Sequence, residues 1–336
     1  MVVEKEGTVQ INGATLYTKS WLPSDGAPKA ILLFIHGFSD HINRYCTFFP
    51  VLAERGIAVH GFDQRGWGRS VRTPADRGQT GGTDQVLADM AAFITPYLPS
   101  GPSDPPVFVM GHSMGGGQVL TLASRPEYRD GLVKRVRGWL LESPFIGFSP
   151  EEEPSWLKVL AGRLAGMLFP GFQLRHPIAP ANLSRDEAVR KSIADDPLMH
   201  NTGTLKGLAG LLDRTAALAS GQAKPLPGAM QSLWIGHGTE DKTTCFKATR
   251  RYFEECLGEV KDKEFKAYEG WYHQLHADGP DSENFFKDVG DWILERCGGG
   301  GGGGGGGEET TGEENGKGKG ADTSEEAAAK KTASKL

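Results

Sequence analysis

The stretch VFVMGHSMGGGQVL joins two kinds of secondary structure through a turn that few residues can form. Residues 107–110 are an apolar run typical of a buried strand, and residues 118–123 have the pattern of a helix. Between them Gly111, Ser113 and Gly115 fit the spacing G-x-S-x-G. A serine on so sharp a turn has a strained backbone, and its neighbours must be small because larger side chains would collide with the strand and the helix. The pattern predicts a nucleophile elbow.

Apolar runs of strand length alternate with helical patterns throughout residues 1–297. The predicted strands are residues 30–35, 58–62, 107–110, 139–141, 233–235 and 265–268. Such alternation is typical of an α/β fold with a mostly parallel central sheet and helices on both faces. Because functional groups gather just past the carboxyl ends of parallel strands, we looked there for the partners of the serine.

A serine hydroxyl is too weakly acidic to attack an ester unaided. It needs an imidazole as base and a carboxylate that fixes the tautomer of that imidazole. Asp241 follows the predicted strand SLWIGHG, and His273 follows the predicted strand KEFKAYEG. The chain order Ser, Asp, His is that of an α/β-hydrolase. We therefore predict a catalytic triad of Ser113, Asp241 and His273.

Acyl transfer through a serine also requires two backbone N–H groups aimed at the developing oxyanion. We predict that Met114 supplies one of them, because it directly follows the nucleophile. Phe38 is predicted to supply the other, because it follows the His-Gly pair at the end of the apolar run ILLFIHG.

His276 lies three residues after His273 and completes an HxxH pair. No set of carboxylate and histidine ligands stands at matching spacing, so we expect a loop role for His276. We predict neither a metal site nor a cofactor.

Charge and cysteine content narrow the range of partners. The chain has 37 basic and 42 acidic side chains and a net charge of -5, with no basic stripe dense enough for nucleic acid. Its four cysteines form no CxxC pair, which predicts reduced thiols.

The N-terminal residues lack the apolar segment of a signal peptide, and no run is long enough to span a membrane. We expect an intracellular protein that is not secreted.

The composition changes abruptly after Cys297, where ten consecutive glycines begin. Residues 298–336 have too few apolar side chains to offset the entropy cost of ordering, which predicts a disordered tail. The final residues Ser334, Lys335 and Leu336 spell SKL, a peroxisomal address read by an import receptor. We expect a peroxisomal location, and otherwise the cytoplasm or the surface of lipid droplets.

The connection at about residues 145–225 is too long for an ordinary loop and predicts an inserted lid. Apolar residues recur there at helical spacing. They are Trp156, Leu157, Val159, Leu160, Leu164, Met167 and Leu168. Trp156, Leu160, Leu164 and Leu168 are the predicted contacts to substrate, and the same face could rest on a membrane or droplet surface. The alternative is that this face simply packs on the core.

At this point the motifs resemble those of a known family, the monoacylglycerol lipases of the serine aminopeptidase S33 group. The resemblance covers residues 10–295 and is carried by HGFSDHINRY, FDQRGWGRS, GHSMGGG, DDPLMHN, GTEDK and EGWYHQLHAD. It implies an α/β-hydrolase fold, with Ser113, Asp241 and His273 as triad and Phe38 and Met114 as oxyanion donors. It also implies hydrolysis of a lipid ester to glycerol and free fatty acid. Phe38 stands where we expect a smaller residue in these lipases.

Three other functions remain open at the level of sequence. An S33-type aminopeptidase would use the same triad, with the acidic residues 151–153 gripping the ammonium group of its substrate. An acyl-CoA thioesterase would need basic residues near the mouth of the site, to bind the nucleotide phosphates. A non-catalytic binding protein with a hydrolase fold is a third possibility, which the complete triad disfavours.

Overall fold

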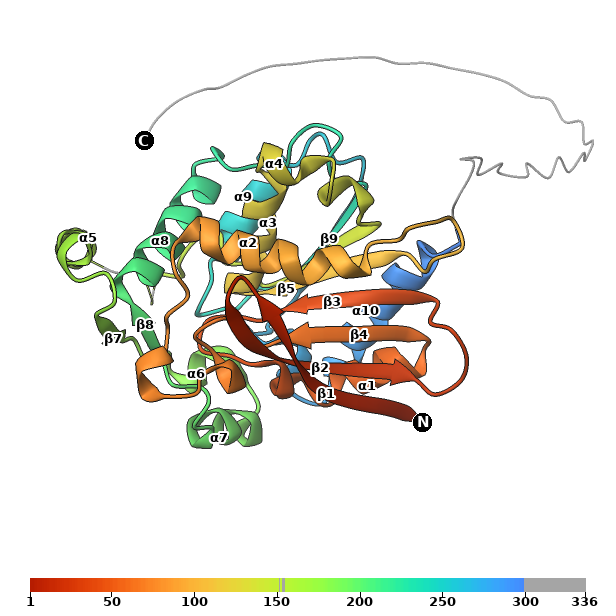
Figure 1. The fold of residues 1–336 in the computed structure, drawn as a ribbon, viewed down its shortest axis with the longest axis horizontal. Helices are drawn as coiled ribbons and strands as arrows, with labels where there is room; N and C mark the ends of the chain where they lie inside the picture. The colour runs from red at the N-terminus through yellow and green to blue at the C-terminus, as the bar shows by residue number, and fades with distance from the viewer. Residues whose placement is uncertain (151, 153–154, 299–336) are drawn as a thin grey trace, which may run out of the picture. The chain divides into compact units, whose positions relative to one another are not determined.

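Figure 1 shows the computed structural model of the protein, which describes residues 1–150, 152 and 155–298. An eight-stranded sheet runs through it in the order β1-β2-β4-β3-β5-β6-β9-β10. The strands are β1 (Val2–Ile11), β2 (Ala14–Pro23), β3 (Ala30–Ile35), β4 (Ile57–Phe62), β5 (Val107–His112), β6 (Gly138–Glu142), β9 (Ser232–Gly238) and β10 (Asp262–Tyr268). β1 and β2 are antiparallel to their neighbours, and the other pairs are parallel. The predicted, mostly parallel sheet is confirmed.

Helices cover both faces of this sheet. The α-helices of the described chain are α1 (Phe48–Glu54), α2 (Thr83–Ile94), α3 (Met114–Ala123), α4 (Pro126–Arg129), α5 (Trp156–Leu168), α6 (Pro180–Leu183), α7 (Glu187–Asp195), α8 (Leu205–Ala219), α9 (Phe246–Cys256) and α10 (Ser282–Glu295), of which α5, α6 and α7 lie in the connection between β6 and β9. Along β3 the side chains of Leu32 and Phe34 join the core formed with α1 and α10. Those of Leu33 and Ile35 join the opposite core, formed with α2, α3 and α9. Because both faces of a parallel strand are buried, the run AILLFI is apolar without alternation.

The two N-terminal strands form a hairpin that the strand prediction missed. Its turn is Asn12-Gly13, with both φ angles positive at 45° and 78°. Asn-Gly is the pair that favours this two-residue turn, since both positions need a left-handed backbone. β1 is largely exposed at the edge of the sheet and carries Glu4, Lys5 and Glu6. Its charged sequence is why it did not read as a strand.

The long connection between β6 and β9 contains α5, α6, α7, α8 and a small antiparallel pair, β7 (Gln173–Arg175) and β8 (Thr202–Thr204). α5 lies where the apolar spacing predicted a helix. Leu164 and Leu168 are exposed on it rather than packed into the core. The side chains of Trp156 and Leu160 lie outside the described part of the structure. That the segment acts as a lid stays a prediction.

No helix in the described part of the chain is both long and apolar enough to cross a membrane. All four cysteines are free, in agreement with the prediction of reduced thiols. Apart from Gly298, the predicted tail with Ser334, Lys335 and Leu336 lies outside the described residues.

Candidate active site

Ser113 stands on the predicted elbow, between the end of β5 and the start of α3. Its φ of 54° and ψ of -118° are costly for a residue with a side chain, and strain of this kind marks functional turns. A Cβ on Gly111 would come within 2.6 Å of the Gly115 backbone, and one on Gly115 would clash with the carbonyl oxygen of Ile35. The Ser113 N–H donates to the Glu142 carbonyl at 2.9 Å, which ties the turn to β6. Glycine at both positions is therefore a steric requirement.

Asp241 and His273 meet at the carboxyl ends of β9 and β10. His273 Nδ1 lies 2.8 Å from Asp241 Oδ2, and both side chains are buried. The backbone N–H groups of Thr243 and Thr244 donate to Asp241 Oδ1 at 2.7 and 2.9 Å. His237 Nε2 lies 3.0 Å from Asp241 Oδ2. The carboxylate is therefore held in one orientation from both sides and orients the imidazole in turn.

The electrostatics of Asp241 keep it ionised. Burial by itself would raise its pKa, but His273 and the hydrogen bonds from His237 and His273 lower the pKa well below its usual value. An ionised carboxylate can stabilise the imidazolium that forms when His273 takes a proton.

Ser113 and His273 both line one cavity, which brings the predicted nucleophile and base to the same space. No hydrogen bond joins Ser113 Oγ to His273 within the described residues. Bonds of this kind are often long before substrate binds and tighten in the reacting complex. The structure thus holds the Asp-His half of the predicted triad together and places the serine beside it.

The two predicted oxyanion donors flank Ser113. Within the described chain, the backbone N–H groups of Phe38 and Met114 donate to no other group. α3 begins at Met114, earlier than the predicted start at residue 118, so the Met114 N–H is one of the unpaired donors at a helix start. A Cβ on Gly37 would lie 3.2 Å from Ser113 Cβ, so the Phe38 loop passes directly beside the nucleophile. Both donors remain available to an oxyanion.

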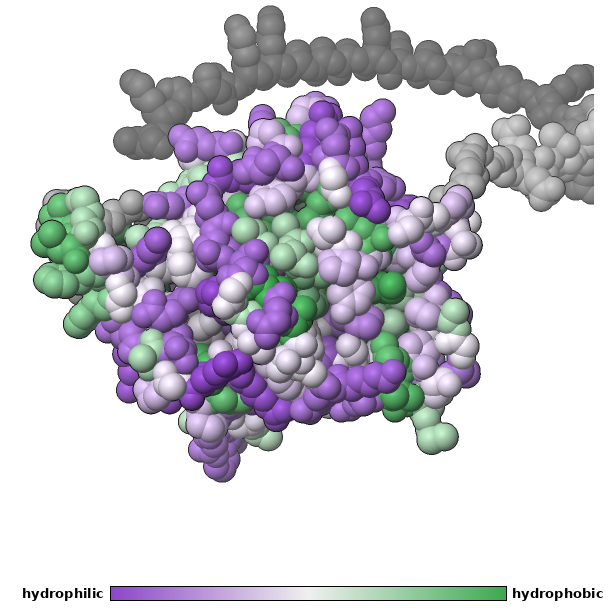
Figure 2. All heavy atoms as spheres, in the orientation of Figure 1, coloured by the Kyte–Doolittle hydropathy of each residue, from purple (hydrophilic) through white to green (hydrophobic). Residues whose placement is uncertain are grey.

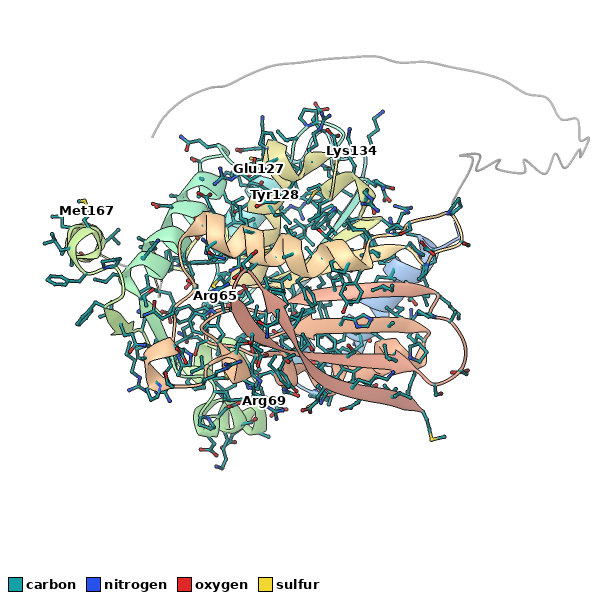
Figure 3. All side chains as sticks on the ribbon, viewed as in Figure 1. Arg65, Arg69, Glu127, Tyr128, Lys134 and Met167 are labelled. Carbon is teal, nitrogen blue, oxygen red and sulfur yellow. The ribbon has the colours of Figure 1, made fainter. Side chains whose placement is uncertain are left out.

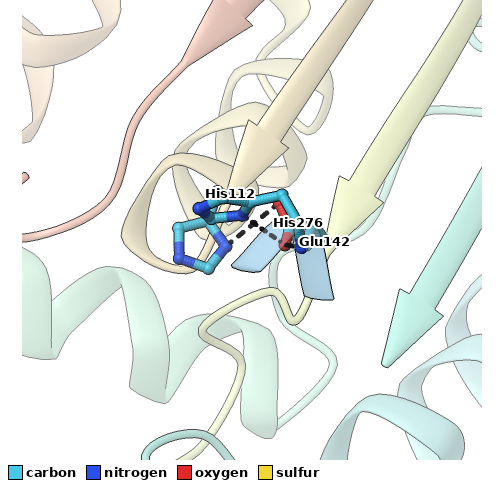
Figure 4. Close-up of side chains that lie close together, drawn as sticks. All are labelled: His112, Glu142 and His276. Atoms are coloured by element: carbon cyan, nitrogen blue, oxygen red, sulfur yellow. Dashed lines mark hydrogen bonds and ion pairs between the residues drawn. The ribbon is translucent and has the colours of Figure 1, made fainter. Parts of the chain in front are cut away.

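Sequence reasoning missed a buried cluster of His112, Glu142 and His276 next to the triad (Figure 4). Glu142 Oε1 accepts from the backbone N–H of His276 at 3.0 Å and lies 2.7 Å from His276 Nδ1. Its Oε2 lies 3.5 Å from His112 Nδ1. The signal was present in the sequence, since WLLES places a glutamate at the end of an apolar run. His276 has the loop role expected of it, because Glu142 fixes the loop that carries His273.

Glu142 is hydrogen-bonded to His276 but not to His112, since Glu142 Oε2 and His112 Nδ1 have no hydrogen-bond partner in the described chain. A gap of 2.7 Å between Glu142 Oε1 and His276 Nδ1 is too short for two atoms that share a metal ion at tetrahedral angles, with ligand distances of about 2 Å. Burial lowers the pKa of His112 to about 4, so this ring is neutral at pH 7. Burial alone would raise the pKa of Glu142, but His276 and His112 lower it. An ionised Glu142 therefore anchors the His276 loop.

Replacing Glu142 by alanine should lower the free energy of unfolding by about 3 to 5 kcal/mol, because it leaves the His276 groups buried without their partner. The rate should fall as well, since the loop of His273 loses its anchor. Chemical denaturation followed by circular dichroism measures the first effect. Glu254→Ala is the control, because this exposed glutamate only pairs with Arg250 on α9. Equal stability of the two variants would show that Glu142 anchors nothing.

Two cavities of different character, one mainly apolar and one with a mixed lining, meet at Ser113. One, of about 430 Å³, extends from Phe38, Ser113 and Met114 between apolar side chains. These include Phe145, Phe148, Val159, Leu174, Leu205, Leu208, Leu211 and Leu212. The other, of about 680 Å³, includes Ser113, His273 and many polar side chains. Phe38, Ser113 and Ile178 line both, and the Phe38 ring packs edge-on against Trp67 at 4.8 Å. An ester bound at Ser113 can therefore place an apolar half and a polar half on different sides.

The sequence of the chain matches a known protein family and named relatives. Residues 26–280 match the family described as serine aminopeptidase, S33. The chain is 35% identical over 287 residues to a putative monoglyceride lipase of Schizosaccharomyces pombe, covering 84% of this chain and 72% of that one. It is 30% identical over 296 residues to the monoglyceride lipase of Homo sapiens, covering 86% of this chain and 89% of that one.

Solved structures show the same fold. A soluble variant of monoglyceride lipase from Saccharomyces cerevisiae, in complex with a substrate analog, matches with a TM-score of 0.79 at 21% identity, covering 88% of this chain and 96% of that one. The monoacylglycerol lipase of Paleococcus ferrophilus matches with a TM-score of 0.70 at 26% identity, covering 84% and 99%. The predicted α/β-hydrolase fold is confirmed.

Proposed function

Because the chain belongs to the serine aminopeptidase S33 family, we propose that it is a serine carboxylic-ester hydrolase that cleaves monoacylglycerols to glycerol and free fatty acid. Its relatives named monoglyceride lipase support this substrate class. The single observation that carries the proposal is the meeting of an apolar and a polar cavity at Ser113. A monoacylglycerol has one apolar chain and one small polar alcohol, joined by the ester that Ser113 would attack.

The reaction proceeds in two steps through the acyl-enzyme. His273 takes the proton of Ser113 Oγ as this oxygen attacks the ester carbonyl, and the N–H groups of Phe38 and Met114 receive the oxyanion. His273 then gives the proton to the leaving alcohol. A water, activated in the same way, releases the fatty acid and restores Ser113. Since His273 lines only the polar one of the two cavities, the alcohol leaves on that side and the acyl chain occupies the other.

An aminopeptidase is the less favoured member of the family for this site. Of the acidic residues 151–153, only Glu152 lies within the described chain. It accepts a hydrogen bond from Asn182 at 2.9 Å and lies 4.0 Å from His176 Nε2. The relatives of this chain named monoglyceride lipase favour ester hydrolysis over peptide cleavage.

Leu208→Trp tests the assignment of the acyl side. A bulky ring in the apolar cavity should exclude part of a long chain, and each excluded methylene costs about 0.8 kcal/mol. Losing two methylenes should lower kcat/KM for oleoylglycerol roughly fifteenfold, while butyrylglycerol should be cleaved as before. Ala216→Trp, on the exposed side of the same helix, is the control. Absence of monoacylglycerol hydrolysis by the unaltered protein would contradict the proposed function.

We also propose contact with a lipid surface through α5. The support is an apolar surface at the left edge of the molecule in Figure 2, over α5, from which Met167 projects in Figure 3. Leu164, Met167 and Leu168 are 55%, 72% and 76% exposed. Apolar side chains on one helix face can enter the boundary of a lipid layer. Met167→Glu should slow hydrolysis of vesicle-borne substrate and spare butyrylglycerol, and an equal effect on both would contradict it.

A peroxisomal location is proposed from the sequence alone. Its only support is the SKL ending after a glycine-rich segment. Microscopy of cells should find the protein in peroxisomes when the Leu336 carboxylate is free. It should find the protein outside them when Ser334, Lys335 and Leu336 are removed, and no difference between the two would refute the idea.

A further inference from the structure

We propose that the polar cavity beside Ser113 binds alcohols that carry a phosphate group, so that the enzyme also cleaves monoacylated glycerol phosphates. This inference rests on the proposed function, because it concerns the alcohol half of the same ester. The reaction is balanced by water: the ester bond breaks, the acyl group leaves as a fatty acid, and the protonated alcohol leaves as glycerol phosphate.

The size of the cavity is the first support. About 680 Å³ lies on the alcohol side, against about 430 Å³ on the acyl side. Volumes of roughly 300 to 1,000 Å³ hold ligands of drug size. A glycerol fills a small part of such a space, so there is room for a larger alcohol.

The charge of the cavity is the second support. Arg77 and Arg175 line it, from the segment before α2 and from the end of β7, and neither guanidinium has a hydrogen bond or ion pair within the described residues. Two carboxylates also line it. Asp196 lies 3.5 Å from Arg44, whereas Asp40 accepts hydrogen bonds from Tyr45 and from the His41 N–H, which leave its negative charge in place. The two arginines are thus cations without a partner in the described chain, and their guanidinium groups have the geometry to bind a phosphate.

The remaining side chains fit a ligand of this kind. Gln274, directly after His273, is 3% exposed, and its Oε1 has no hydrogen-bond partner within the described chain. A buried acceptor without a partner is costly, and a hydroxyl of the bound alcohol would satisfy it. Burial lowers the pKa of His112 and His200 to about 4. These two rings line the cavity as neutral groups, so the positive charge comes from the arginines.

Position distinguishes a glycerol phosphate from coenzyme A, the other common phosphate-bearing leaving group. In coenzyme A the phosphates are separated from the thioester by the long pantetheine arm. In an acylglycerol phosphate only the short glycerol separates the phosphate from the ester. Arg77 and Arg175 line the same cavity as Ser113 and His273, and this shared lining is our reason for proposing the shorter connection.

The test compares 1-oleoylglycerol, 1-oleoylglycerol 3-phosphate and oleoyl-CoA as substrates of the full chain. The unaltered enzyme should cleave the first two. Arg77→Ala and Arg175→Ala should each lower the ratio of kcat/KM for the phosphorylated substrate to that for 1-oleoylglycerol by about tenfold to hundredfold, mainly through KM. Arg72→Ala, an exposed arginine of the same segment that does not line the cavity, should leave the ratio unchanged. Glycerol 3-phosphate should also inhibit at lower concentration than glycerol or inorganic phosphate.

The outcomes separate this inference from the function on which it rests. Cleavage of 1-oleoylglycerol without cleavage of its phosphate would overturn the inference and leave the function intact. An unchanged ratio in both Arg77→Ala and Arg175→Ala would also overturn it, as would a selective loss of oleoyl-CoA cleavage in these variants. Failure to cleave any of the three would instead overturn the proposed function.

Discussion

Ser113→Ala should fold normally and lose activity by a factor on the order of 10⁴ to 10⁶, because the triad acts as a unit. Stability should hardly change. Ser113 Oγ forms no hydrogen bond within the described residues, and alanine keeps the Cβ that the strained turn already accommodates. Hydrolysis of 1-oleoylglycerol, followed by release of fatty acid, measures the rate, and thermal unfolding checks the fold.

Ser143→Ala is the matched control for this variant. Ser143 is also a buried serine at the end of a strand, its φ of 45° is similar, and its Oγ lacks a hydrogen-bond partner within the described structure. It lines neither cavity. Turnover should therefore stay close to that of the unaltered protein. A folded Ser113→Ala with most of its activity would show that Ser113 is not the nucleophile.

Asp241→Asn should lower kcat by about 10⁴, because an amide cannot hold the His273 tautomer that accepts the serine proton. Both oxygens of Asp241 accept, from Thr243 and Thr244 on one side and from His273 on the other. An asparagine must turn its NH₂ toward one of these donors. We therefore expect a loss of about 1 to 3 kcal/mol in the free energy of unfolding as well.

The pH dependence of stability gives a second readout for Asp241. The pKa of this carboxyl is lower in the folded protein than its ordinary value of 3.8, so its stabilising contribution is present above that value. It is lost as pH falls through the lower pKa of the folded state. The asparagine variant should lack this part of the acid destabilisation. Asp288→Asn, which affects a carboxylate bonded to Tyr268 away from the site, is the control for activity.

The triad could be predicted from the sequence because each member follows a strand at the same edge of the sheet. In a parallel sheet these ends are neighbours, so chain order and strand ends suffice to bring Asp241 and His273 together. The elbow could be predicted because its glycines are sterically required at Gly111 and Gly115. The required glycines and the ends of strands can both be recognised from short stretches of sequence.

Other features depend on contacts between distant segments. Glu142 anchors His276 across 134 positions of the chain, and an isolated glutamate gives no sign of its partner. Arg77 and Arg175 line one cavity only because the segment before α2 and β7 approach the same site. The hairpin of β1 and β2 was missed because an exposed edge strand carries charges instead of an apolar run.

β6 and β9 are parallel neighbours in the sheet, so the intervening residues 143–231 form an excursion that leaves at the carboxyl edge of the sheet and returns to its amino edge. Ser113 precedes this excursion, and Asp241 and His273 follow it. The three triad residues therefore all lie outside the excursion. It contacts the nucleophile and its helix at its two ends, where the Phe145 N–H donates to the Ser113 carbonyl and α8 packs on α3. Chimaeras that exchange the stretch from α5 to α7 between relatives should inherit substrate preference from the donor and reaction type from the host.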